Sequence, residues 1–144
     1  MVPLSVRLGH DERKPHVRLE VIGFKHPEVV EPDGLDLLVC RVHANATPVS
    51  ATFDLSVSVA ELLDLRNYLA QINSGNGPPA TFSMAGGLFS LSFAPSRRGP
   101  VLCAVFLKSI DASHVRLEYL VTLEPESITR SLADLALLEK AAAE

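Results

Sequence analysis

"FDLSVSVAELLDLRNYLAQINSG", residues 53–75, contains a strand that is followed directly by a helix. Up to Val59 every second residue is apolar, which is the period of a strand with one buried face. Beyond it the apolar residues come three or four positions apart, as on one side of a helix: Leu62, Leu65, Leu69 and Ile72. Ser58 stands where the period changes and Glu61 follows three residues later, which is the capping-box pattern of a helix start. The polar residues of this junction are therefore predicted to serve folding rather than chemistry.

Two further strands are predicted before this junction. HVRLEVIGF (16–24) alternates apolar and polar residues, whereas LDLLVCRVHA (35–44) is apolar on nearly both faces, which indicates a central position in a sheet. The charged residues before Pro15 indicate a turn or linker. Residues 1–14 are predicted to form an N-terminal arm or a short edge strand.

Four short strands and a second helix are predicted after the junction. The strands are PATFSMA, LFSLSFA, VLCAVFLKS and HVRLEYLVTL, and the short turns between them indicate antiparallel neighbours. Glu124-Pro125-Glu126 then begins a helix with an apolar stripe. We expect a single domain over residues 1–144 of class α+β. It would have one antiparallel sheet of about six or seven strands and two helices packed on it, in the order βββ-α-ββββ-α.

The composition is typical of a globular protein. The 144 residues are 47% apolar and 21% charged, and the net charge is −4. No apolar run is long enough to span a membrane, and the first residues lack the pattern of a secretory signal, so we expect a cytoplasmic protein without a membrane partner. The mild acidity argues against a nucleic-acid partner. The isolated cysteines, Cys40 and Cys103, are predicted to be buried free thiols.

The sequence contains no recognisable catalytic motif. The five histidines show no HxH, HxxxH or HExxH spacing, so a metal site would require several of them to converge in space. A G-x-S-x-G nucleophile motif and a phosphate-binding glycine loop are also missing from the sequence. We therefore predict no enzyme activity, no catalytic residue, no cofactor and no metal.

An acidic loop is the most distinctive segment of the chain. It begins with KHPEVVEPDG (25–34), where two prolines restrict the backbone, and four carboxylates lie within nine residues: Glu28, Glu31, Asp33 and Asp36. Acids of this kind often do no more than keep a loop solvated. They can also present carboxylates to basic side chains of a partner and speed association by electrostatic steering. We predict these four residues as partner-binding.

Four stretches carry a resemblance to a known family. They are RLEVIGFKHPEVVEPDGLDLLVCRV (18–42), SVAELLDLRNYLAQI (58–72), FSLSF (89–93) and VRLEYLVTLEPESITRSLADL (115–135). In this order they resemble the WapI-type family of bacterial immunity proteins, and the similarity covers residues 17–140. The positions that carry it, besides the hydrophobic pattern, are Gly23, Phe24, Pro27, Glu28 and Glu61.

The resemblance implies a non-catalytic binding protein. Such proteins bind and neutralise a toxin domain made by the same cell, so the expected partner is a cognate toxin domain, and no cofactor comes with the family. The mild negative charge and the acidic loop would suit a basic toxin such as a nuclease.

Two alternatives stay open at this stage. The first is a small ligand-binding domain or enzyme in which His26, His43 or His114 meet over the polar face of the third strand, formed by Ser50, Thr52, Asp54 and Ser56. A deep cleft at that face would favour an enzyme, and a flat, solvated face would favour binding. The second is a self-assembling protein, because strands that are apolar on both faces leave surface for a homodimer.

Overall fold

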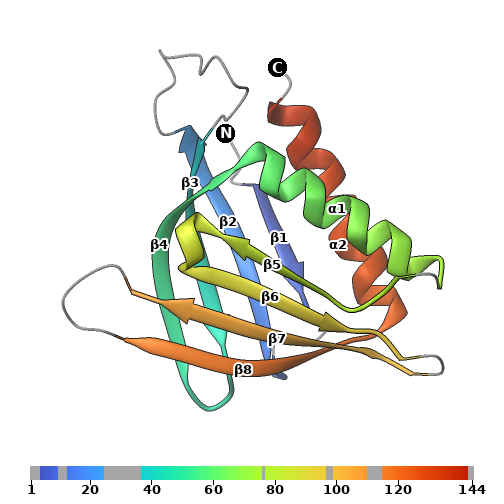
Figure 1. Cartoon of the computed structure of the whole chain (residues 1–144). Coiled ribbons are helices and arrows are strands. Elements are labelled where there is room, and N and C mark those ends of the chain that lie inside the picture. The colour runs from blue at the N-terminus through green and yellow to red at the C-terminus, as the bar shows by residue number, and fades with distance from the viewer. Residues whose placement is uncertain are drawn as a thin grey trace.

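A computed structural model of the chain describes residues 4–9, 13–24, 37–75, 77–96, 99–109 and 115–142. These residues form two four-stranded antiparallel sheets and two α-helices in the order ββββ-α-ββββ-α (Figure 1). The predicted α+β class, the antiparallel pairing and the places of both helices are confirmed. The strands of the described part number eight and divide into two sheets instead of forming one.

Sheet A contains the strands that precede the first helix. They are β1 (Leu4–Leu8), β2 (His16–Phe24), β3 (Leu37–Asn45) and β4 (Ser50–Ser58), paired in that order. β3 lies inside the sheet, as its apolar character predicts, and β1 is the edge strand that was one of the two interpretations of residues 1–14. The inner side chains of β3 are fully buried, among them Leu38, Cys40 and Val42.

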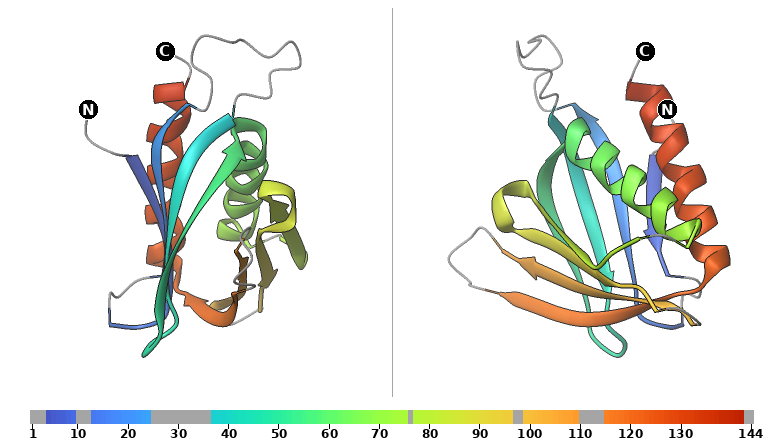
Figure 2. Two further views of the ribbon diagram at one scale, coloured as in Figure 1. Left: turned by 90° about the vertical axis from the view of Figure 1, so that its left-hand side faces the viewer. Right: turned by 45° about the vertical axis from the view of Figure 1, so that its right-hand side comes forward.

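Sheet B contains β5 (Ala80–Met84), β6 (Phe89–Ala94), β7 (Val101–Lys108) and β8 (Arg116–Leu123), again paired in sequence order. Its strands cross those of sheet A, and both sheets contribute to one apolar core (Figures 1 and 2). The Tyr119 hydroxyl of β8 donates a hydrogen bond to the backbone oxygen of His16 in β2 at 2.8 Å. This bond ties the two sheets together.

Helix α1 (Val59–Asn73) begins with the predicted capping box. The backbone N–H of Glu61 donates to the Ser58 hydroxyl at 3.1 Å, and the backbone N–H of Ser58 donates to the Glu61 carboxylate at 2.9 Å. The predicted apolar stripe is buried: Leu62, Leu65, Leu69 and Ile72. α1 lies on the same side of sheet A as sheet B does (Figure 2).

Helix α2 (Pro125–Ala142) runs along the outer edge of β1 (Figure 1). The Ser131 hydroxyl donates to the backbone oxygen of Arg7, and the backbone N–H of Arg7 donates to the Asp134 carboxylate at 3.5 Å. These bonds occupy backbone groups of an edge strand that would otherwise be open to pairing with another chain. α2 also contacts α1 through an ion pair between Arg66 and Glu139.

The division into two sheets follows from the junction at Ser58. Because β4 continues directly into α1, the chain leaves sheet A and turns across its inner side before β5 begins. β5 therefore starts a second sheet instead of pairing with β4. Hydrophobic periodicity assigns side chains to faces and does not identify strand neighbours, so the sequence pattern fits one sheet as well as two.

Removing the helix cap should show how much the junction contributes to the free energy of unfolding. Ser58→Ala leaves the N–H of Glu61 without its acceptor and should lower the free energy of unfolding by about 1 kcal/mol. Chemical denaturation followed by circular dichroism measures this change. Ser50→Ala, at the exposed start of β4, is the matched control and should be close to neutral. Equal effects of the two substitutions would contradict a stabilising cap.

The bond between the two sheets can be tested in the same way. Tyr119→Phe removes only the hydroxyl that donates to His16, so the free energy of unfolding should fall by about 1 kcal/mol. Thr122→Val, at an exposed position of the same strand, is the control. Unchanged stability of Tyr119→Phe would show that water replaces this bond without loss.

Candidate interaction faces

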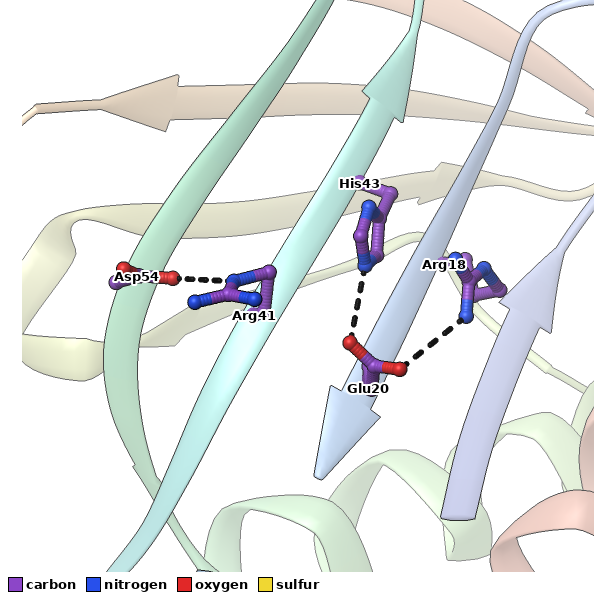
Figure 3. A network of polar contacts seen from close by, with 5 residues as sticks. All are labelled: Arg18, Glu20, Arg41, His43 and Asp54. Atoms are coloured by element: carbon purple, nitrogen blue, oxygen red, sulfur yellow. Dashed lines mark hydrogen bonds and ion pairs between the residues drawn. The ribbon is translucent and has the colours of Figure 1, made fainter. Parts of the chain in front are cut away.

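The acidic loop lies outside the residues that the structure describes, so the partner-binding role of Glu28, Glu31, Asp33 and Asp36 stays a prediction. The described residues do contain a second set of charged side chains, on the outer face of sheet A, which is the face turned away from sheet B and α1 (Figure 3). The strand register brings this set together.

Three neighbouring strands supply the charged residues of the outer face. Glu20 of β2 lies opposite Arg41 of β3, and Arg41 lies opposite Asp54 of β4. In the adjacent row Arg18 of β2 lies opposite His43 of β3. Neighbouring side chains on one face of a sheet are close enough to interact, so a correct register alone creates the contacts. We call these five residues the charged network.

Glu20 connects one half of the charged network. Its carboxylate lies 3.2 Å from Nε2 of His43 and 3.9 Å from a terminal nitrogen of Arg18. The Glu20 side chain is only 22% exposed, whereas those of His43 and Arg18 are about one-third exposed. The carboxylate is thus held between two basic side chains, and both of these remain accessible from solvent.

Arg41 and Asp54 form the other half of the charged network. Nε of Arg41 donates to the Asp54 carboxylate at 2.9 Å, and this hydrogen bond, with the negative charge of Asp54, raises the pKa of the guanidinium above its usual value. The contact uses Nε alone. Within the described part of the chain, the two terminal nitrogens of Arg41 have no hydrogen-bond acceptor. A guanidinium oriented in this way can bind a carboxylate through two parallel hydrogen bonds.

The polar residues of β4 lie on this same outer face, as the sequence predicts. Its buried positions alternate with Ser50, Thr52, Asp54 and Ser56, of which Ser50, Thr52 and Asp54 are exposed. The described residues of sheet B form an open depression of about 440 Å³ on another part of the surface, lined by Ser92, Ala104, Phe106, Glu118 and Leu120 among others. The polar face of β4, whose shape was expected to distinguish an enzyme from a binding protein, is therefore exposed to solvent.

The outer face of sheet B also carries apolar side chains. Leu102 of β7 and Leu120 of β8 are 44% and 60% exposed, and β7 is apolar on both of its faces. A homodimer would cover such a surface, which keeps self-assembly open as a prediction.

The histidines do not converge in the part of the chain that is described. His43 belongs to the charged network, and the His16 ring is hydrogen-bonded to the backbone oxygen of Lys14 at 3.0 Å. His10, His26 and His114 lie outside the described residues. Among the residues that are described, no group of three or more His, Cys, Asp or Glu side chains could hold a metal ion.

Both cysteines are buried and free, as predicted. Burial raises the pKa of the Cys40 thiol and of the Cys103 thiol from about 9 to about 12. A thiol of this kind is protonated at neutral pH and is a poor nucleophile, because the reactive form is the thiolate. The cysteines therefore act as small apolar core residues.

A thiol-reactive dye should confirm this assignment. In the native protein at pH 8 neither cysteine should react with Ellman's reagent, whereas both should react in concentrated guanidinium chloride. The free energy of unfolding should be unaffected by the thiols below about pH 9 and should fall as the pH rises towards 12, because only the unfolded thiols ionise in that range. Rapid native labelling would contradict the buried placement, and Cys103→Ala would then identify the reactive site.

The charged network was missed by sequence reasoning, although part of its signal is visible. Alternation in β2 and β3 indicates that Arg18, Glu20, Arg41 and His43 avoid the core. It does not indicate which of them are neighbours, because that depends on the strand register. The β-bulge between Val21 and Gly23 shifts this register further along the strands.

The described chain has no helix that is both long and apolar enough to cross a membrane. Comparisons with known proteins find no match among family models, curated proteins or solved structures. The function must therefore be inferred from the geometry of the exposed faces and from the resemblance in the sequence.

Proposed function

We propose that this chain is an immunity-type binding protein that neutralises a cognate bacterial toxin by binding to it, without catalysis. The observation that carries the proposal is the outer face of sheet A, where a charged network stands on three adjacent strands and no described element covers it. The resemblance to the WapI-type immunity proteins supplies the class of partner.

The geometry of this face suits a protein partner. The charged side chains start from paired strands, which are more rigid supports than loops. Their mutual contacts hold them in one arrangement before a partner arrives, so less conformational entropy is lost on binding. Opposite charges at fixed spacing favour one partner over others, because a misaligned partner would bring like charges together.

An enzyme would require a different shape of the same face. Substrate sites are generally concave and bury most of their ligand. Ser50, Thr52 and Asp54 of β4 are solvent-exposed instead, and the depression on sheet B is open. These features support binding to an extended surface over chemistry on a small molecule.

Co-expression with the toxin domain encoded beside this chain tests the proposal. The toxin alone should stop growth, the two proteins together should permit it, and a stable complex should be recovered when an inactive form of the toxin is used as bait. A full loss of rescue together with the absence of a complex would contradict the proposed function.

Titration of the toxin's activity separates binding from catalysis. An immunity protein that occludes its partner inhibits in proportion to the amount added, so inhibition should be complete near one equivalent. A protein that modifies or degrades the toxin would turn over, and would inhibit completely at far below one equivalent. The second result would contradict a non-catalytic mechanism while leaving the partner unchanged.

A further inference from the structure

We propose that the chain forms a symmetric dimer in which β8 of one copy pairs antiparallel with β8 of a second copy, so that sheet B continues from one copy into the other. The inference concerns a different surface from the outer face of sheet A, and it does not rest on the proposed function. It rests on the open edge of β8 and on the side chains that this edge carries.

The backbone of β8 is open to pairing along its outer edge. β8 is the last strand of sheet B and has β7 as its neighbour on one side (Figure 1). The backbone N–H of Ser109 donates to the backbone oxygen of Val115 at 2.9 Å, so Val115 turns its backbone groups towards β7. Because this direction alternates along a strand, the next groups to point away from β7 are those of Arg116, Glu118, Leu120 and Thr122. Within the described part of the chain, no hydrogen bond engages these outward groups.

The position of β8 leaves room beside this edge. The hydroxyl of Tyr119 donates to His16, where β2 begins, and it also contacts the backbone of Asn45, where β3 ends. His16 and Asn45 face each other in the last row of sheet A. β8 therefore lies over the end of sheet A, and a strand added beside it would extend sheet B away from the body of the molecule.

The other edges of the two sheets are less suited to pairing. β1 is covered by α2, and β5 has only five residues. β4 presents the polar side chains of Ser50, Thr52 and Asp54 on its exposed face. β8 has eight residues, and its Leu120 side chain is 60% exposed. A long edge strand with an exposed apolar side chain is a template for a strand of another chain.

The charged side chains at this edge favour a second copy over an arbitrary strand. Arg116 and Glu124 are exposed, and within the described residues neither has an ion-pair partner. Such charges normally prevent pairing, because an arbitrary strand leaves them uncompensated. In a two-fold symmetric pair with Leu120 at the axis, the two copies of Leu120 face each other and Arg116 of each copy faces Glu124 of the other. Each copy thus supplies the opposite charge that the other needs.

The neighbouring registers are less favourable. With Glu118 at the axis, the two copies of this glutamate face each other, and with Val121 at the axis each Glu118 faces a Glu124. Like charges in directly opposite positions destabilise a strand pair. With Tyr119 at the axis, each Glu118 faces Leu120 and no opposite charges meet. The register centred on Leu120 is therefore the one that joins apolar to apolar side chains and basic to acidic ones.

The oligomeric state of the full chain tests the inference. Sedimentation equilibrium over a range of concentrations should show a dimer, and Leu120→Lys should raise its dissociation constant about tenfold or more. Leu102→Lys is the matched control, because Leu102 is 44% exposed on the same face of sheet B but belongs to β7. It should change the constant less than about threefold. A chain that stays monomeric at every concentration, or equal effects of the two substitutions, would overturn the inference.

A charge exchange tests the register. Arg116→Glu and Glu124→Lys should each weaken the dimer, because each brings like charges together across the axis. The double variant restores opposite charges and should recover the dissociation constant to within about threefold of the original. Circular dichroism establishes that each variant remains folded. A double variant as weak as the single ones would overturn the pairing of Arg116 with Glu124.

A disulfide at the axis provides a covalent test. In an antiparallel pair the Cα atoms of hydrogen-bonded opposite residues lie about 5.5 Å apart, a separation that a disulfide can span. Leu120→Cys should therefore oxidise to a covalent dimer, seen on a non-reducing gel. The native cysteines should not interfere, because both are buried and their pKa values are raised to about 12. Leu102→Cys is the control, and cross-linking of Leu120→Cys no faster than that of the control would overturn the inference.

Discussion

The direct passage from β4 into α1 at Ser58 determines the arrangement of everything that follows. The capping box satisfies two backbone N–H groups at the point where the strand period ends, so the chain turns there without an intervening loop. The turn takes α1 across the inner side of sheet A, and sheet B follows on that same side (Figure 2). The core then forms between sheet A and the elements on its inner side, sheet B and α1, and α2 adds Ile128, Leu135 and Leu138 to it.

This arrangement leaves the outer face of sheet A uncovered by any described element. Since sheet B and α1 lie inside and α2 occupies the edge of β1, no part of the described chain reaches the other side. Alternation along β2, β3 and β4 then places polar side chains there. The exposed charged network is thus a consequence of the direction in which the chain leaves β4, and not of a separate binding module.

Much of this fold is predictable from the sequence, and the limits have physical causes. The strand alternation, the cap at Ser58 with Glu61, and the apolar stripe of α1 are local properties, so the sequence pattern identifies them. The separation into two sheets is a property of strand neighbours, which periodicity does not encode. The contacts of Glu20 and Arg41 depend on the same register, so these residues appear in the sequence only as polar positions in otherwise apolar strands. The acidic loop was the stronger local signal, and it lies outside the described residues.

The two faces of sheet A are therefore subject to different physical constraints. On the inner face Leu38, Cys40 and Val42 are almost completely buried, and a change of volume there would disturb the packing of both sheets. On the outer face Arg41 and Asp54 are largely exposed, and ion pairs in such positions contribute little to folding. Charged residues on the outer face can be substituted with small effects on the core. Each substitution nevertheless alters which partner surface is complementary to this face. A protein built in this way can change its partner while keeping its fold, which is what the proposed role in binding one toxin among many would require.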